Sequence, residues 1–90
     1  VNFMGDSSFG MVGMDVETGV RESIPVLTIV FNNGRMGGYT RHHPVATKTH
    51  GINLQTGRYA DVALALGATG ERVERVADLE PALQRAIQST

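Results

Sequence analysis

Residues 4 to 33 read MGDSSFGMVGMDVETGVRESIPVLTIVFNN, and the expected fold follows from this stretch. A short apolar segment ends at Gly5, a segment with helical spacing comes next, and an apolar, β-branched segment then runs to Phe31. This order predicts a β-α-β unit, in which both parallel strands end at the same edge of a sheet, where ligands bind. Asp6 and Asn33 follow the two strands, and we therefore expect these side chains to lie close together at that edge.

The residues expected at this edge suit a metal ion and a diphosphate group. The Asp6 carboxylate and an Asn carboxamide are hard oxygen ligands of the kind that Mg²⁺ prefers. Ser7 and Ser8 are expected at the start of the following helix, with Ser8 as its N-cap, where free N–H groups and the helix dipole attract phosphate. A simpler interpretation is that Asp6 caps the helix and that residues 32 to 34 form an ordinary turn. The presence of Gly-Asp at residues 5 and 6 together with Asn-Asn at residues 32 and 33 favours the metal site.

The pattern of Gly-Asp, a small residue, a helix, a strand and Asn-Asn resembles the cofactor-binding motif of thiamine-diphosphate (ThDP)-dependent enzymes. The text NFMGDSSFGMVGMDVETGVRESIPVLTIVFNNGRMGGY is similar to the C-terminal cofactor-binding domain of acetolactate synthase-like and 2-oxo acid decarboxylase-type members. Weaker similarity continues through RYADVALALGATGERVERVADLEPALQRAI. The resemblance covers nearly the whole chain and implies that residues 1–90 are part of a ThDP- and Mg²⁺-binding domain.

The resemblance implies three protein ligands for Mg²⁺. Asp6 and Asn33 would bind the ion through side-chain oxygens, and Arg35 would bind it through its backbone carbonyl. The diphosphate and water would complete the coordination shell, as is usual for protein-bound Mg²⁺.

The resemblance also implies contacts with the cofactor itself. Ser7, Ser8 and Phe9 would offer backbone N–H groups to the diphosphate, and Met36 would lie beside the cofactor. Ser7 stands where glycine is commonest in this family, so a positive φ at this position would strain the backbone. No residue of this chain is expected to be catalytic.

The rest of the chain predicts an α/β fold in the order β-α-β-loop-α-β-α, with a parallel sheet flanked by helices. The expected segments are a strand over 1–4, a helix over 9–21, a strand over 24–31 that is buried on both faces, a loop over 34–57, a helix over 59–66, a strand over 71–74 and a helix over 79–87. Because the chain opens within a strand and closes at the end of a helix, we expect a fold that is incomplete at both ends and a fragment of a longer protein.

Composition excludes several classes of function. Eight Lys and Arg residues against nine Asp and Glu residues give a formal net charge of −1, so nothing indicates binding of nucleic acid or of an anionic membrane. The chain has no cysteine for a disulfide framework or a thiolate zinc site, which suits a cytoplasmic location. No apolar run reaches the roughly 18 residues of a membrane helix.

His42, His43 and His50 lie in the long loop. Adjacent histidines take part in catalysis in some decarboxylases of the superfamily that the chain resembles, but there they belong to the other, N-terminal domain. Solvated loop residues are therefore the favoured interpretation. A zinc site is disfavoured because the sequence offers neither cysteine nor a helical His-x-x-x-His pair.

The resemblance implies that the parent enzyme is a ThDP-dependent lyase or transferase acting next to a carbonyl group. Its partner would be a pyrimidine-binding domain in the same or a second subunit, in a homo-oligomer, and the chain alone would be inactive. The loop after Asn33 lacks the Gln-Trp text of biosynthetic acetolactate synthases, so a benzoylformate or oxalyl-CoA decarboxylase type is comparably plausible. Two alternatives are a small subunit of a split ThDP enzyme and a non-catalytic α/β binding module.

Overall fold

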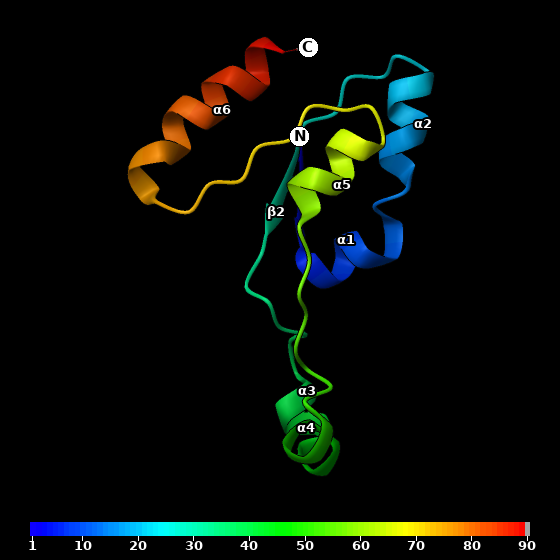
Figure 1. The fold of residues 1–90 in the computed structure, drawn as a ribbon, viewed down its shortest axis with the longest axis vertical. Coiled ribbons are helices and arrows are strands. Elements are labelled where there is room, and N and C mark those ends of the chain that lie inside the picture. The colour runs from blue at the N-terminus through cyan, green and yellow to red at the C-terminus, as the bar shows by residue number, and fades with distance from the viewer. Residues whose placement is uncertain (90) are drawn as a thin grey trace.

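A computed structural model describes residues 1–89 as an elongated molecule with extents of 46 × 31 × 19 Å (Figure 1). Its elements are β1 (Asn2–Gly5), α1 (Asp6–Val12), α2 (Asp15–Arg21), β2 (Thr28–Phe31), α3 (Tyr39–His42), α4 (Pro44–His50), α5 (Tyr59–Ala65), a short 3₁₀ helix η1 (Val76–Asp78) and α6 (Leu79–Gln88). In the described residues, no helix is both long and apolar enough to cross a membrane.

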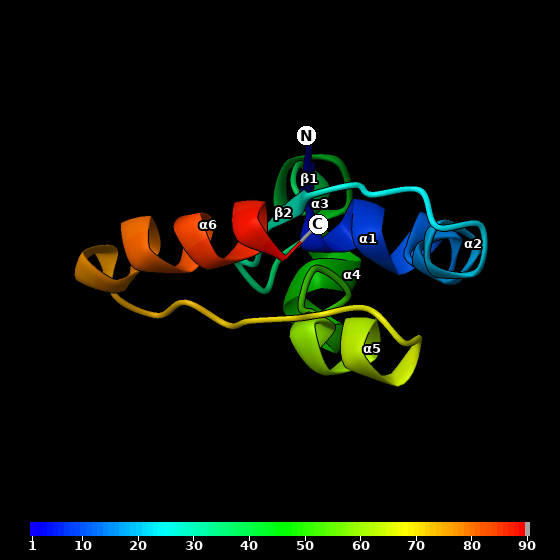
Figure 2. The same ribbon diagram turned by 90° about the horizontal axis from the view of Figure 1, so that it is seen from above.

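The predicted β-α-β unit and α/β class are confirmed. Strands β1 and β2 are parallel and in register from Asn2 opposite Thr28 to Gly5 opposite Phe31. Helices α1 and α2 form the connection between them, and Figure 2 shows α2 and α6 projecting to opposite sides of the sheet. Both strands therefore end at the same edge, which is where α1 begins.

The single helix predicted over 9–21 is wrong, since the segment forms two helices that are interrupted at Gly13 and Met14. The first begins at Asp6 with Gly5 as its N-cap, so Ser8 is not the cap residue. The interruption has a packing reason. A Cβ atom at Gly13 would lie 2.6 Å from the Phe9 carbonyl oxygen and 2.7 Å from its ring, so glycine lets the buried Phe9 side chain lie against the backbone. Glycine also weakens a helix at this point.

The second strand is shorter and more exposed than predicted. Its ladder covers only Thr28–Phe31 because β1 offers only four residues for pairing. Burial on both faces is also wrong, since Phe31 is 62% exposed and stacks on Phe3 with the ring centroids 6.2 Å apart. Among residues 1–89 the sheet has only these two strands, so each strand also has one unpaired edge.

The strand predicted over 71–74 does not form, because no strand in the described part of the chain pairs with it. The segment is irregular and leads into η1 and α6, and Glu71 forms an ion pair with Arg85 of α6. The predicted helices over 59–66 and 79–87 are confirmed as α5 and α6.

Residues 34–57 are not an irregular loop, contrary to prediction. Helices α3 and α4 form a projection, here called the arm (residues 35–54), at the lower end of the molecule in Figure 1. An antiparallel bridge between Arg35 and Leu54 closes its base, and the Met36 N–H donates to the Asn53 carbonyl oxygen at 2.8 Å. The helices were missed because a turn of four residues and a helix of seven are too short to show a clear period.

Candidate functional site

Asp6 joins the ends of the two strands. It is only 2% exposed, and its carboxylate accepts two backbone hydrogen bonds. Oδ1 accepts from the Ser7 N–H at 3.0 Å, and Oδ2 accepts from the Gly34 N–H at 2.8 Å. Gly34 has a φ of 69°, a left-handed conformation that favours glycine. The Asp6 carboxylate is therefore bound to the loop after β2, at the residue that follows Asn33.

Asn33 orders that loop through its own side chain. Its Oδ1 accepts from the Arg35 N–H at 3.0 Å, which fixes the turn that leads into the arm. The Asn33 side chain is exposed, so its oxygen is accessible from solvent as well as being oriented by this hydrogen bond. The Asp6 carboxylate and the Asn33 side chain thus accept hydrogen bonds from two adjacent backbone N–H groups, those of Gly34 and Arg35.

Sequence reasoning missed Gln55, which reaches the start of α1 from the far side of the arm. Its Nε2 donates to Ser7 Oγ at 2.9 Å, and its backbone N–H donates to the Gly34 carbonyl oxygen at 2.9 Å. Its Oε1 is buried and has no hydrogen-bond partner in the described residues. No local pattern could have revealed this residue, because its contact with Ser7 spans 48 positions of sequence.

The four residues expected to contact the cofactor differ in their location and burial. Ser7 and Ser8 lie in the first turn of α1, where N–H groups have no backbone carbonyl partner within the helix. The Ser7 N–H donates to the Asp6 side chain instead, and Ser7 has no positive φ. Phe9 lies one residue further, and its buried ring packs edge-on against Tyr59 with centroids 5.5 Å apart. Met36 is half-buried at the base of the arm.

The available donors fit a hard divalent cation. One buried carboxylate, the carboxamide oxygens of Asn33 and Gln55 and nearby backbone carbonyls are all oxygen donors of the type that Mg²⁺ takes. A bound cation would also attract the buried Gln55 Oε1, which has no hydrogen-bond partner in the described residues. Within residues 1–89, no three His, Cys, Asp or Glu side chains are grouped so that they could hold a metal ion.

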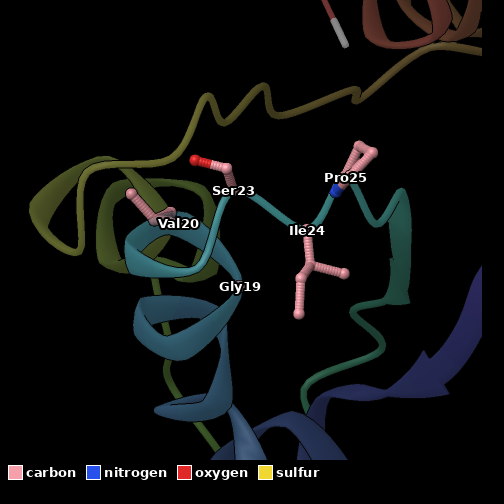
Figure 3. Close-up of a pocket in the computed structure, with 5 residues that line it drawn as sticks. All are labelled: Gly19, Val20, Ser23, Ile24 and Pro25. Carbon is pink, nitrogen blue, oxygen red and sulfur yellow. The ribbon is translucent and has the colours of Figure 1, made fainter.

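Two surface hollows lie at opposite ends of β2. The one at its carboxyl end is lined by Asn32, Gln55, Thr56, Gly57, Arg58 and Arg72. The other lies between α2 and the chain entering β2, with the Ile24 side chain pointing between them, and has no charged residue in its lining (Figure 3). Only the first hollow includes Gln55, which donates hydrogen bonds to Ser7 and Gly34, so the candidate site belongs at the carboxyl edge.

Comparison with known proteins finds a family model and several relatives that match the chain. A family model described as "Thiamine pyrophosphate enzyme, C-terminal TPP binding domain" matches residues 1–90. The chain is 34% identical over 89 residues to sulfoacetaldehyde acetyltransferase of Alcaligenes xylosoxydans xylosoxydans, covering 97% of this chain and 15% of that protein. It is 39% identical over 92 residues to a probable acetolactate synthase of Mycobacterium bovis, covering 99% of this chain and 17% of the relative.

A third relative is oxalyl-CoA decarboxylase of Escherichia coli, which is 36% identical over 90 residues, with 94% of this chain and 15% of the relative covered. The chain therefore spans only 15% to 17% of the length of these three proteins.

Proposed function

The chain belongs to the family of C-terminal TPP-binding domains of thiamine pyrophosphate enzymes, and we propose that it holds the diphosphate of ThDP through Mg²⁺ at the carboxyl edge of β1 and β2. The family supports ThDP as the cofactor, whereas the metal and its ligands are our proposal. The observation that carries it is the buried Asp6 carboxylate, which the Ser7 and Gly34 N–H groups hold at the junction of the two strand ends.

In this proposal Asp6, Asn33 and the Arg35 carbonyl oxygen hold the metal ion. Ser7 and Ser8 offer N–H groups to the diphosphate, and Met36 lies beside the cofactor. Phe9 lends an N–H group as well, although its side chain serves the core. When bound, ThDP supplies the carbanion-stabilising chemistry, and the residues of this chain supply position and charge.

We further propose that the chain works within a cytoplasmic lyase or transferase of the acetolactate synthase-like or 2-oxo acid decarboxylase type. An acetyltransferase, a synthase and a decarboxylase match at 34%, 39% and 36% identity, so identity does not select one reaction. Because this chain spans 15% to 17% of those proteins, the pyrimidine-binding domain would come from elsewhere in the same subunit or from a second subunit of a homo-oligomer. The chain alone is expected to show no decarboxylation of pyruvate.

Paramagnetic Mn²⁺ in place of Mg²⁺ tests the proposed site residue by residue. With ThDP present, the amide signals of Ser7, Ser8 and Gly34 should broaden in an NMR spectrum of the chain. Signals of α6, which lies on the opposite side of the sheet from α1 and α2, should keep their width. Broadening centred on His42, His43 and His50 instead would place the metal in the arm and contradict the proposal.

A further inference from the structure

Positive charge is unevenly distributed along the chain. The sequence has no acidic residue between Ser23 and Ala60, whereas the arm contains Arg35, Arg41 and Lys48 in addition to all three histidines. All nine Asp and Glu residues therefore lie outside the arm, and the formal net charge of −1 conceals a positive projection on an otherwise negative molecule.

Ion pairing separates these three cations from the others. Every Lys or Arg outside the arm pairs with a carboxylate: Arg21 with Glu17, Arg58 with Asp61, Arg72 with Glu74, Arg75 with Asp78 and Arg85 with Glu71. In the part of the chain that the structure describes, no carboxylate forms a salt bridge with Arg35, Arg41 or Lys48, and all three are exposed. The charges of the arm are thus available to a ligand.

The arm holds its cations in a defined structure. The Thr47 hydroxyl donates to the Tyr39 carbonyl oxygen at 3.1 Å, and the ring of Tyr39 packs edge-on against His43 with centroids 5.5 Å apart. These contacts join α3 to α4 and so connect the helix that carries Arg41 to the helix that carries Lys48.

The arm also stands directly on the candidate site. Its base begins at Arg35, next to the Gly34 N–H that binds Asp6, and α3 and α4 extend beyond the ends of the strands in Figure 1. A set of unpaired cations raises the local concentration of anions around it. Guanidinium groups bind carboxylate and phosphate in a two-pronged geometry, and an ammonium group adds a compact point charge.

We propose that the arm binds the carboxylate or sulfonate group of an organic substrate beside the diphosphate site, with Arg41 and Lys48 as the binding cations. This rests on the proposed function, because it names the substrate class of the same site. It assigns helices α3 and α4 of the arm a role separate from that of the metal ligands, which hold the cofactor.

Titration of the chain with sulfoacetate and with inorganic phosphate, without ThDP or Mg²⁺ and at low ionic strength, tests the proposal by NMR. Shifts should concentrate on residues 39–50. Arg41→Gln and Lys48→Gln should each weaken sulfoacetate binding about fivefold, the effect expected for one exposed charge pair. The matched control is Arg75→Gln, which removes a paired cation outside the arm and should leave the affinity unchanged.

Equal affinities in the arm variants and the Arg75→Gln control, or no binding at all, would overturn the proposal. Phosphate binding as tight as sulfoacetate binding would overturn the assignment to an organic substrate. Asp6→Asn separates this inference from the proposed function, because it should weaken ThDP binding and leave sulfoacetate binding intact. Loss of both in that variant, with circular dichroism unchanged, would contradict an independent arm site.

Discussion

At the scale of single residues, a few buried polar contacts define the candidate site. Asp6 was predictable from sequence because it follows a strand within a two-part motif. Gln55 was not, since its position depends on how the chain returns from the arm to Ser7. The break at Gly13 was equally hidden, because it arises from the close approach of Phe9 and not from glycine content alone.

Replacing Gln55 with alanine should weaken Mg²⁺-dependent ThDP binding by about two- to tenfold. The variant loses the hydrogen bond from Nε2 to Ser7 Oγ, and such a bond contributes about 0.5–1.5 kcal/mol. Calorimetric titration measures the change. Gln84→Ala, an exposed substitution on α6, is the control and should bind ThDP like the wild type. Identical affinities for the two variants would remove Gln55 from the site.

Gly13→Ala should destabilise the fold by about 1–3 kcal/mol, because the new methyl group would overlap the Phe9 carbonyl and ring. Urea unfolding followed by circular dichroism measures the free energy of unfolding. Gly10→Ala, within α1, is the control, because a Cβ atom at Gly10 has no neighbour within 4 Å. That control should be neutral or more stable by up to about 1 kcal/mol, since alanine favours helix. A neutral Gly13→Ala variant would contradict the packing account.

At the scale of elements, the sequence pattern predicted a strand correctly only where another strand pairs with it. The strands β1 and β2 form because they pair with each other, and the pairing limits β2 to four residues. The apolar residues 24–26 and the segment over 71–74, which Val73 and its context predicted as a strand, find no ladder partner in the described chain. Ladder hydrogen bonds, rather than β propensity, therefore decide which of these segments is a strand.

The attachment of α6 should weaken in acid. Arg85 donates a hydrogen bond to Glu71 and holds the pKa of that exposed carboxyl below its ordinary value of 4.5, aided by the opposite charge. A carboxyl with a lowered pKa stabilises the folded state above its unfolded pKa, and this contribution is lost as the pH falls through the folded value. The backbone order of α6, measured by NMR relaxation, should therefore decrease slightly between about pH 6 and pH 3.

Glu71→Gln should lack this pH dependence, because it cannot form the ion pair at any pH. Glu80→Gln is the control, since Glu80 lies in the first turn of α6 and has no salt bridge within residues 1–89. Its α6 should respond to pH as the wild type does. An equal response in Glu71→Gln would show that the ion pair does not hold the helix.

At the scale of the whole molecule, the chain combines a well-defined edge with little core. Only Phe9 and Ala82 are buried apolar residues among those described, and Phe3 and Phe31 expose 61% and 62% of their surfaces. A two-stranded sheet has little independent stability. The hydrogen bond from the Gly34 N–H to Asp6 therefore helps to fix the ends of the strands relative to the loop. The fold class and the site edge could be predicted because both follow from the β-α-β order, whereas burial and the arm depend on contacts far apart in sequence.

The most direct test of the central claim is calorimetric titration of the folded chain with ThDP, with and without Mg²⁺, for the wild type, Asp6→Asn and the exposed control Asp15→Asn. We predict Mg²⁺-dependent binding by the wild type and by Asp15→Asn. Binding by Asp6→Asn should be at least about tenfold weaker, since hydrogen bonds and ligation by a charged group are worth about 1.5–3 kcal/mol. Equal affinity of Asp6→Asn and the wild type, or ThDP binding that does not depend on Mg²⁺, would contradict the assignment of Asp6 as the metal ligand of the diphosphate site.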